Sequence, residues 1–284
     1  MSDDLSNHNR NNTANHLPHF HQLCFTIFKL AHFQIFKLKK HIPNIVTLMN
    51  MACGCAGIAM VFGGMAEWAP FMIFAGAIFD FFDGFVARAF KADSELGKQL
   101  DSMSDLVTFG VLPATLLLVL LNFSGETSII PGWHLPIVTG FSLAWHQTLP
   151  LFIVTLGAGY RLAKFNIDTR QTTSFLGLPS PANGIFFAAL FLGVSFGNFP
   201  ERLIPIILSP ITLYSLAIVF ALLMVSEIPM FAMKVKGYGW KGNEFRYALL
   251  ILSLPLIVFF QFAGLSLCII LYILLSIIQN LVKR

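Results

Sequence analysis

Four aspartates lie close together in an otherwise apolar part of the chain, and their spacing predicts a metal site. The stretch runs from residue 80 to residue 105 and reads DFFDGFVARAFKADSELGKQLDSMSD. Asp80 and Asp83 are three residues apart, and Asp101 and Asp105 are four apart, so each pair shares one face of a helix. Carboxylates at membrane depth are costly unless they are paired or bound to a metal. Oxygen ligands suit hard divalent cations, above all Mg²⁺ together with substrate phosphates. We therefore expect two consecutive helices, joined by a short polar turn, to hold divalent cations between them.

The full spacing is more specific than the aspartates alone. It can be written D-x2-D-G-x2-A-R-x8-G-x3-D-x3-D, and it resembles at every specified position the signature of the CDP-alcohol phosphotransferases. These are integral membrane enzymes of phospholipid synthesis. The positions that carry the resemblance are Asp80, Asp83, Gly84, Ala87, Arg88, Gly97, Asp101 and Asp105.

The resemblance implies a role for each carboxylate. Asp80, Asp83 and Asp101 correspond to metal ligands, and Asp105 to a ligand that also accepts the proton of the acceptor hydroxyl. Two divalent cations, Mg²⁺ or Mn²⁺, are the implied cofactors, and they would neutralise the bridging oxygens of a pyrophosphate. The implied donor is CDP-diacylglycerol, from which an alcohol displaces CMP. Gly84 has no side chain, so substrate or a neighbouring helix can approach the backbone beside the site.

Five other residues are candidates for binding the CDP-diacylglycerol. Arg88 offers a planar fork for phosphate oxygens, although an arginine at a helix end also serves as a membrane anchor. Ser94 would contact the diphosphate by resemblance, or it would cap the following helix. Asn44, Thr47 and Asn50 follow helical spacing and would face the cytidine or ribose by resemblance. Asn44 follows a proline and could instead only start the helix.

The acceptor alcohol is suggested by segments outside the signature. Residues 41–54, 161–166, 177–182, 224–230 and 240–244 are similar to those of bacterial phosphatidylserine synthases. Arg161 or Lys164 could hold the carboxylate of L-serine, and Asn166 could orient a polar group of it. Positive charge near the membrane surface together with loop capping explains the same three residues equally well. Lys164 departs from the arginine expected there, so the charge is kept but the planar fork is lost.

Three other functions compete with a serine transferase. The same chemistry could use glycerol 3-phosphate or inositol phosphate, for which Arg161, Lys164 and Arg170 would supply the basic cluster. A cation-coupled or proton-coupled transporter also carries buried carboxylates, but it would place them near the bilayer midplane in repeated halves. No convincing internal repeat is found. A catalytically dead scaffold is disfavoured because the signature is complete.

Composition places the chain among polytopic membrane proteins and leaves no room for a large soluble domain. Hydrophobic residues make up 56% of it and charged residues 11%, and the mean hydropathy is +0.74. Residues 1–24 predict a disordered polar tail, residues 25–40 an amphipathic helix on the membrane surface, and residues 41–284 the transmembrane domain. We expect membrane lipid as a partner and no nucleic acid. Oligomeric state is not readable from the sequence, and a homodimer is left open.

The predicted fold is an all-α bundle of about eight transmembrane helices. Spans are expected near 43–63, 68–90, 98–121, 145–164, 182–199, 209–232, 246–263 and 264–281, with Gly264 as the hinge between the last two. If the N-terminus is cytoplasmic, every Lys and Arg except Arg202 falls on the cytoplasmic side. We therefore expect both termini in the cytoplasm, the aspartates at the cytoplasmic edge, and the protein in the inner membrane of a bacterium.

Overall fold

The computed structural model describes residues 41–90, 94–123, 143–168, 175–231, 239–240 and 242–282. Within these residues the chain is almost entirely helical, as predicted. The elements are a helix His41–Phe62, α3 (Ala69–Phe90), α4 (Glu95–Asp105), the π-helix η1 (Leu106–Val111), α5 (Leu112–Asn122), α6 (Trp145–Thr148), the 3-10 helix η2 (Leu149–Phe152), α7 (Ile153–Ile167), β1 (Phe175–Leu176), α8 (Ser180–Ser195), α9 (Ile204–Ile207), α10 (Pro210–Val225), β2 (Pro229–Met230) and α11 (Glu244–Val282).

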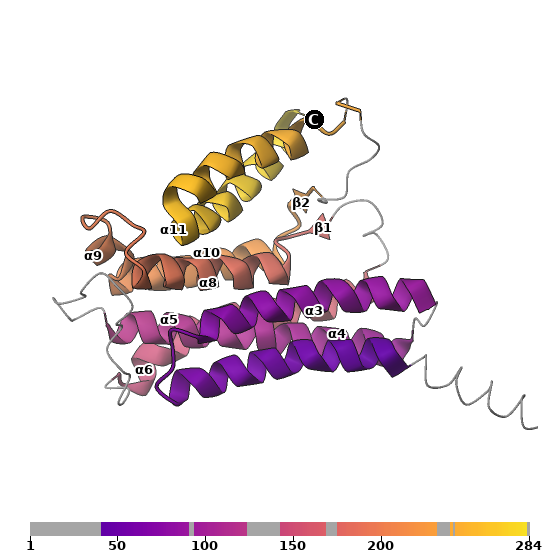
Figure 1. Ribbon diagram of the computed structural model, residues 1–284, viewed down its shortest axis with the longest axis horizontal. Helices are drawn as coiled ribbons and strands as arrows, with labels where there is room; N and C mark the ends of the chain where they lie inside the picture. Colours follow the sequence, from indigo (N-terminus) through magenta and orange to yellow (C-terminus); the bar gives the residue numbers. More distant parts are fainter. Residues whose placement is uncertain are drawn as a thin grey trace, which may run out of the picture.

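Four of these helical segments are long and apolar enough to cross a membrane, which makes this an integral membrane protein. They are His41–Phe62, Ala69–Phe90, Glu95–Asn122 and Glu244–Val282. Two further apolar helices, α8 and α10, are shorter. Figure 1 shows the long helices of the first half running side by side, with α8 and α10 between them and α11. The count of eight spans stays a prediction, and the amphipathic helix 25–40 lies outside the described residues.

The segment Glu95–Asn122 is the centre of the bundle. Of the 18 most apolar consecutive residues in this segment 83% are buried, against 28% in each of the two preceding helices. It begins at Ser94, whose hydroxyl accepts a hydrogen bond of 3.0 Å from the Gly97 amide and so caps the helix. Close approach to this segment depends on glycine. A Cβ at Gly54 or Gly76 would lie within 2.6 Å of the Thr108 side chain, so both neighbouring helices can reach it only without side chains there.

The last apolar stretch turns earlier than predicted. α11 is interrupted at Gln261, where the backbone adopts φ 49° and ψ −120°, and its two arms fold back on each other (Figure 1). Gly264, the predicted hinge, instead lies where the arms touch: a Cβ there would be 2.0 Å from the Leu256 carbonyl oxygen. The hinge prediction was therefore three residues too far along, because the glycine serves close packing and not the turn.

A two-residue ladder fixes where α8 begins. β1 and β2 pair antiparallel, with Phe175 opposite Met230. Gly177 follows at φ +76°, and a Cβ there would lie 2.4 Å from the Met224 carbonyl oxygen. The Gly177 amide also donates to the Ile228 carbonyl. The loop before α8 is thus tied to the end of α10, and this holds Ser180 at a fixed place beside the aspartates.

Candidate active site

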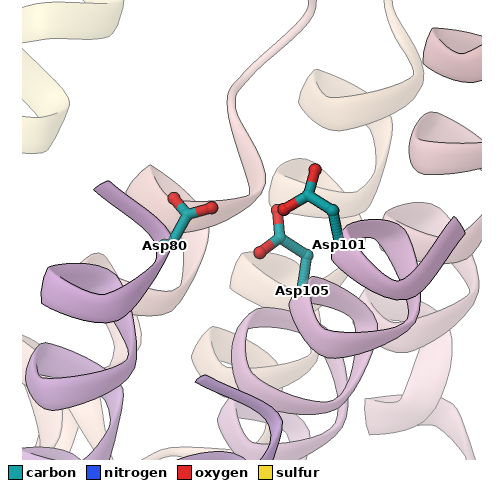
Figure 2. Close-up of side chains that lie close together, drawn as sticks. All are labelled: Asp80, Asp101 and Asp105. Carbon is teal, nitrogen blue, oxygen red and sulfur yellow. The ribbon is translucent and has the colours of Figure 1, made fainter. Parts of the chain in front are cut away.

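Three of the four predicted aspartates meet between two helices. Asp80 comes from α3, and Asp101 and Asp105 from successive turns of α4. One carboxylate oxygen from each lies within 4.8 Å of the others. Figure 2 shows the three side chains converging on one space from the two helices. Asp80 of α3 and the pair Asp101 and Asp105 of α4 therefore face one space between the two helices.

Asp83 lies one turn further along α3 and outside this group of three. Its side chain lines a neighbouring cavity, and the residue is only 7% exposed. Within the described part of the chain its Oδ2 has no hydrogen-bond partner. A buried carboxylate oxygen without a partner is unfavourable in the protein alone, so it indicates a position prepared for a cation or a polar ligand.

The cavity beside Asp83 has a volume of about 510 Å³, which is large enough for a small polar ligand. The helix His41–Phe62, α3 and α4 enclose it. Its lining residues are Pro43, Asn44, Thr47, Asp83, Gly84, Ala87, Ser94, Glu95, Gly97, Lys98 and Asp101. Four predicted donor-binding residues, Asn44, Thr47, Gly84 and Ser94, are therefore brought together here. A Cβ at Gly84 would meet nothing within 4 Å, so its backbone faces open space.

The other two predicted donor-binding residues have different surroundings. Arg88 is exposed and donates from Nε to the Gly84 carbonyl of its own helix, 2.9 Å away. Asn50 is fully buried and does not line the cavity. Its Nδ2 donates to Asp105 Oδ1 at 3.2 Å, so the structure connects it with the carboxylate group and not with the cavity.

The three predicted acceptor-binding residues are brought together only in part: Arg161 and Lys164 line one small cavity, and Asn166 is not among its lining residues. Arg161 is buried and donates from Nη1 to Ser180 Oγ at 2.9 Å. Lys164 forms an exposed ion pair of 2.8 Å with Glu227. Asn166 donates from Nδ2 to the Ser102 hydroxyl, and its backbone carbonyl accepts from Lys98. Arg161 is connected with Asp105 through Ser180.

Ser180 is the site residue that sequence reasoning missed. Its hydroxyl donates to Asp105 Oδ2 at 3.2 Å, and the residue is completely buried. A signal was present in the segment 177–182, which was singled out as similar to a family of enzymes without any role being given to its serine. Ser180 and Asp105 are 75 residues apart in the sequence, so no helical spacing could connect them.

The carboxylates fit divalent cations. Three carboxylates within 4.8 Å repel one another unless positive charge lies between them, and Asp83 adds an unpartnered oxygen nearby. Hard oxygen donors of this kind match Mg²⁺ or Mn²⁺, which would polarise a pyrophosphate and stabilise its leaving group. The cavity next to the carboxylates has room for the phosphates that such cations bind together with protein.

The comparisons with known proteins agree with this geometry. A profile of the family described as CDP-alcohol phosphatidyltransferase matches residues 40–279, almost the whole described region. The chain belongs to this family and is therefore a transferase. The transporter and scaffold alternatives are set aside by this membership together with the complete aspartate signature.

Three relatives give the comparison more detail. The chain is 33% identical over 156 residues to a Bacillus subtilis protein named CDP-diacylglycerol–serine O-phosphatidyltransferase, covering 53% of this chain and 75% of the relative. It is 32% identical over 187 residues to a protein of the same name from Methanocaldococcus jannaschii, covering 66% and 72%. An archaetidylserine synthase of Methanothermobacter thermautotrophicus is 27% identical over 177 residues, covering 62% and 68%.

Proposed function

We propose that this enzyme transfers the phosphatidyl group of CDP-diacylglycerol to the hydroxyl of L-serine, giving phosphatidylserine and CMP. The observation that carries the proposal is the agreement between the relatives and the site. Two of the three relatives are named as serine O-phosphatidyltransferases. The third is named as the synthase of archaetidylserine, which is a serine product of a different lipid. The shared element of those names is serine. The carboxylates and the cavity supply what a CDP-linked donor requires.

The donor would occupy the cavity with its pyrophosphate against the aspartates. Asp80, Asp83, Asp101 and Asp105 would hold two divalent cations, and these would polarise the pyrophosphate for attack. Asn44, Thr47 and Ser94 line the same cavity and would contact the nucleotide part. Gly84 leaves the backbone of α3 accessible there, and Arg88 at the exposed edge would turn to the phosphates when they are present.

The reaction itself needs a proton acceptor at the attacking oxygen. The serine hydroxyl oxygen would form a bond to the lipid-bearing phosphorus, the bond from that phosphorus to the CMP oxygen would break, and CMP would leave with the electron pair. Asp105 would take the hydroxyl proton, since it lies at the inner end of the carboxylate group and is almost fully buried. Arg161 would attract the serine carboxylate from the same side, because its buried Nε has no hydrogen-bond partner in the described residues. Lys164 and Asn166, nearer the surface, would complete the acceptor path.

The distribution of charge supports a site that opens to the cytoplasm. The Lys and Arg residues lie almost entirely on the side of the aspartates if both termini are cytoplasmic. We propose the inner membrane of a bacterium as the location, since a cytoplasmic site meets both a soluble amino acid and a CDP-linked lipid. A homodimer is the assembly we would test first.

An acceptor screen tests the proposal. Purified protein in detergent is given CDP-diacylglycerol and Mg²⁺ or Mn²⁺, and CMP release is measured with serine, glycerol 3-phosphate or inositol phosphate. We expect release with serine and a background rate with the others, and an Asp101→Asn variant serves as the inactive control. Release with glycerol 3-phosphate and none with serine would overturn the acceptor while leaving the family chemistry intact.

A further inference from the structure

Both carboxylate oxygens of Asp105 are held by buried side chains from distant parts of the sequence. Asn50 Nδ2 donates to Oδ1, and Ser180 Oγ donates to Oδ2, each at 3.2 Å. Asn50 and Ser180 are completely buried, and Asp105 is 6% exposed. A carboxylate fixed at both oxygens has a single orientation, and its remaining lone pairs point in defined directions.

Arg161 determines which way the Ser180 hydroxyl points. Its Nη1 donates to Ser180 Oγ at 2.9 Å. A guanidinium has donors and no acceptor, so Ser180 must accept from Arg161. The single hydroxyl hydrogen is then available for Asp105, and the positive charge beside the oxygen makes that hydrogen a better donor. The three residues therefore form a directed chain that ends on Asp105.

The turn that carries Ser180 is also attached to the helix that carries Asp105. Asn183, one turn further along α8, donates from Nδ2 to the Phe109 carbonyl at 2.8 Å. That carbonyl belongs to η1, the π-helix immediately after Asp105, and π-helical turns are frequent at functional sites. Gly184 allows this approach, because a Cβ there would lie 2.8 Å from the Phe109 ring. The first turn of α8 thus contacts both the carboxylate and the backbone beyond it.

We propose that Ser180 is a positioning residue for the transfer reaction, which orients the Asp105 carboxylate under the direction of Arg161. The inference rests on the proposed role of Asp105 as ligand and proton acceptor. With Ser180 in place, the carboxylate is already oriented when the acceptor arrives. Without the Ser180 hydroxyl, only the hydrogen bond from Asn50 holds the Asp105 carboxylate. The carboxylate can then rotate, and it loses alignment with both the cations and the hydroxyl of the acceptor. Arg161 then affects the chemical step through Ser180, in addition to any contact with serine.

The test compares three serine variants of α8. Ser180→Ala removes the hydroxyl, and Ser180→Thr restores one. Ser195→Ala is the matched control, because Ser195 is a buried serine of the same helix whose hydroxyl donates only within the helix, to the Phe191 carbonyl. For each protein we would measure kcat, the KM values for both substrates, the thermal unfolding temperature in detergent, and Mn²⁺ affinity by electron paramagnetic resonance without substrates. If Ser180→Ala yields no folded protein, Ser180→Cys replaces it, since a thiol is a much weaker donor.

We expect Ser180→Ala to lower kcat and to weaken Mn²⁺ binding, each roughly 10- to 100-fold, as for other residues that orient metal ligands. The KM for CDP-diacylglycerol should stay within about threefold, Ser180→Thr should regain most of the kcat, and Ser195→Ala should match the wild type. Wild-type kcat and Mn²⁺ affinity in Ser180→Ala, or no recovery in Ser180→Thr, would overturn the proposal. A wild type that is inactive with serine but active with another acceptor would refute the proposed substrate instead, and the same variants would then be measured with that acceptor.

Discussion

The two halves of the central helix are built in different ways. α4 carries Asp101 and Asp105 and presents polar side chains to the neighbouring helices, where they make hydrogen bonds. α5, which continues it beyond η1, is buried at every position from Leu112 to Leu121 and is held by apolar packing. One continuous span thus places charge at one end of the bundle. The charged half is tolerated because its groups are partnered or prepared for cations, while the apolar half supplies the packing that holds them in position.

The junction between the halves is itself unusual. η1 is π-helical, and its carbonyls at Phe109 and Gly110 accept hydrogen bonds from the side chains of Asn183 and Thr155. A π-helical turn contains more residues than an α-helical turn, so it rotates the side chains of α5 relative to those of α4. The aspartates can therefore face α3 while the leucines that follow face the core.

Loss of a site carboxylate should abolish activity without unfolding the protein. Asp83→Asn and Asp101→Asn are each expected to lower kcat/KM by about a thousandfold or more, because removing one carboxylate leaves an incomplete set of ligands around an anionic substrate. The unfolding temperature in detergent should not fall, since mutual repulsion among the carboxylates decreases. CMP release and thermal unfolding are measured on the same preparations. Near-normal activity of both variants at ordinary metal concentrations would refute the two-metal site.

Truncation in the apolar half should have the opposite effect. Leu117→Ala removes a completely buried side chain of α5 and should lower the free energy of unfolding by about 2–4 kcal/mol through the cavity it leaves. The kcat of the protein that remains folded should stay within about twofold of wild type. Reversible unfolding in mixed detergents gives the first quantity, and CMP release per folded molecule gives the second. A selective loss of kcat would mean that the two halves are not separable.

The smallest expected effect lies at the junction and uses a matched pair of threonines. The Thr108 hydroxyl donates to the Asn50 carbonyl of another helix at 2.9 Å, whereas the Thr115 hydroxyl donates to Leu112 of its own helix. Thr108→Val should cost about 1 kcal/mol of stability and should lower kcat severalfold, because it loosens the helix that holds Asn50 against Asp105. Thr115→Val should leave kcat unchanged. Equal kcat values for the two variants would show that the junction does not support the site.

Local spacing in the sequence was sufficient for the long helices and for the grouping of Asp101 with Asp105 on one helix face. Asp101 and Asp105 are four residues apart, and a helix of any kind would place them on one side. Apolar length predicted the four segments that are long enough to cross a membrane, while the count of eight spans stays a prediction, and Ser94 was correctly considered as a helix cap. The CDP-alcohol family was also predictable, because its signature is written in one continuous stretch of chain.

The environment of those faces was decided by the tertiary structure. The family resemblance assigned Asn50 to the nucleotide together with Asn44 and Thr47, but neither resemblance nor helical spacing showed that it donates to a carboxylate 55 residues away. In the same way Arg161 was considered as a ligand of the serine carboxylate or as positive charge near the membrane surface, and only the tertiary structure shows that it is buried and donates to Ser180. The turn at Gln261 was misplaced because a glycine signals either a bend or a close contact, and the sequence alone does not distinguish them. Periodicity within one helix follows from backbone geometry and is legible in the sequence, whereas a contact between helices depends on how all of them pack together.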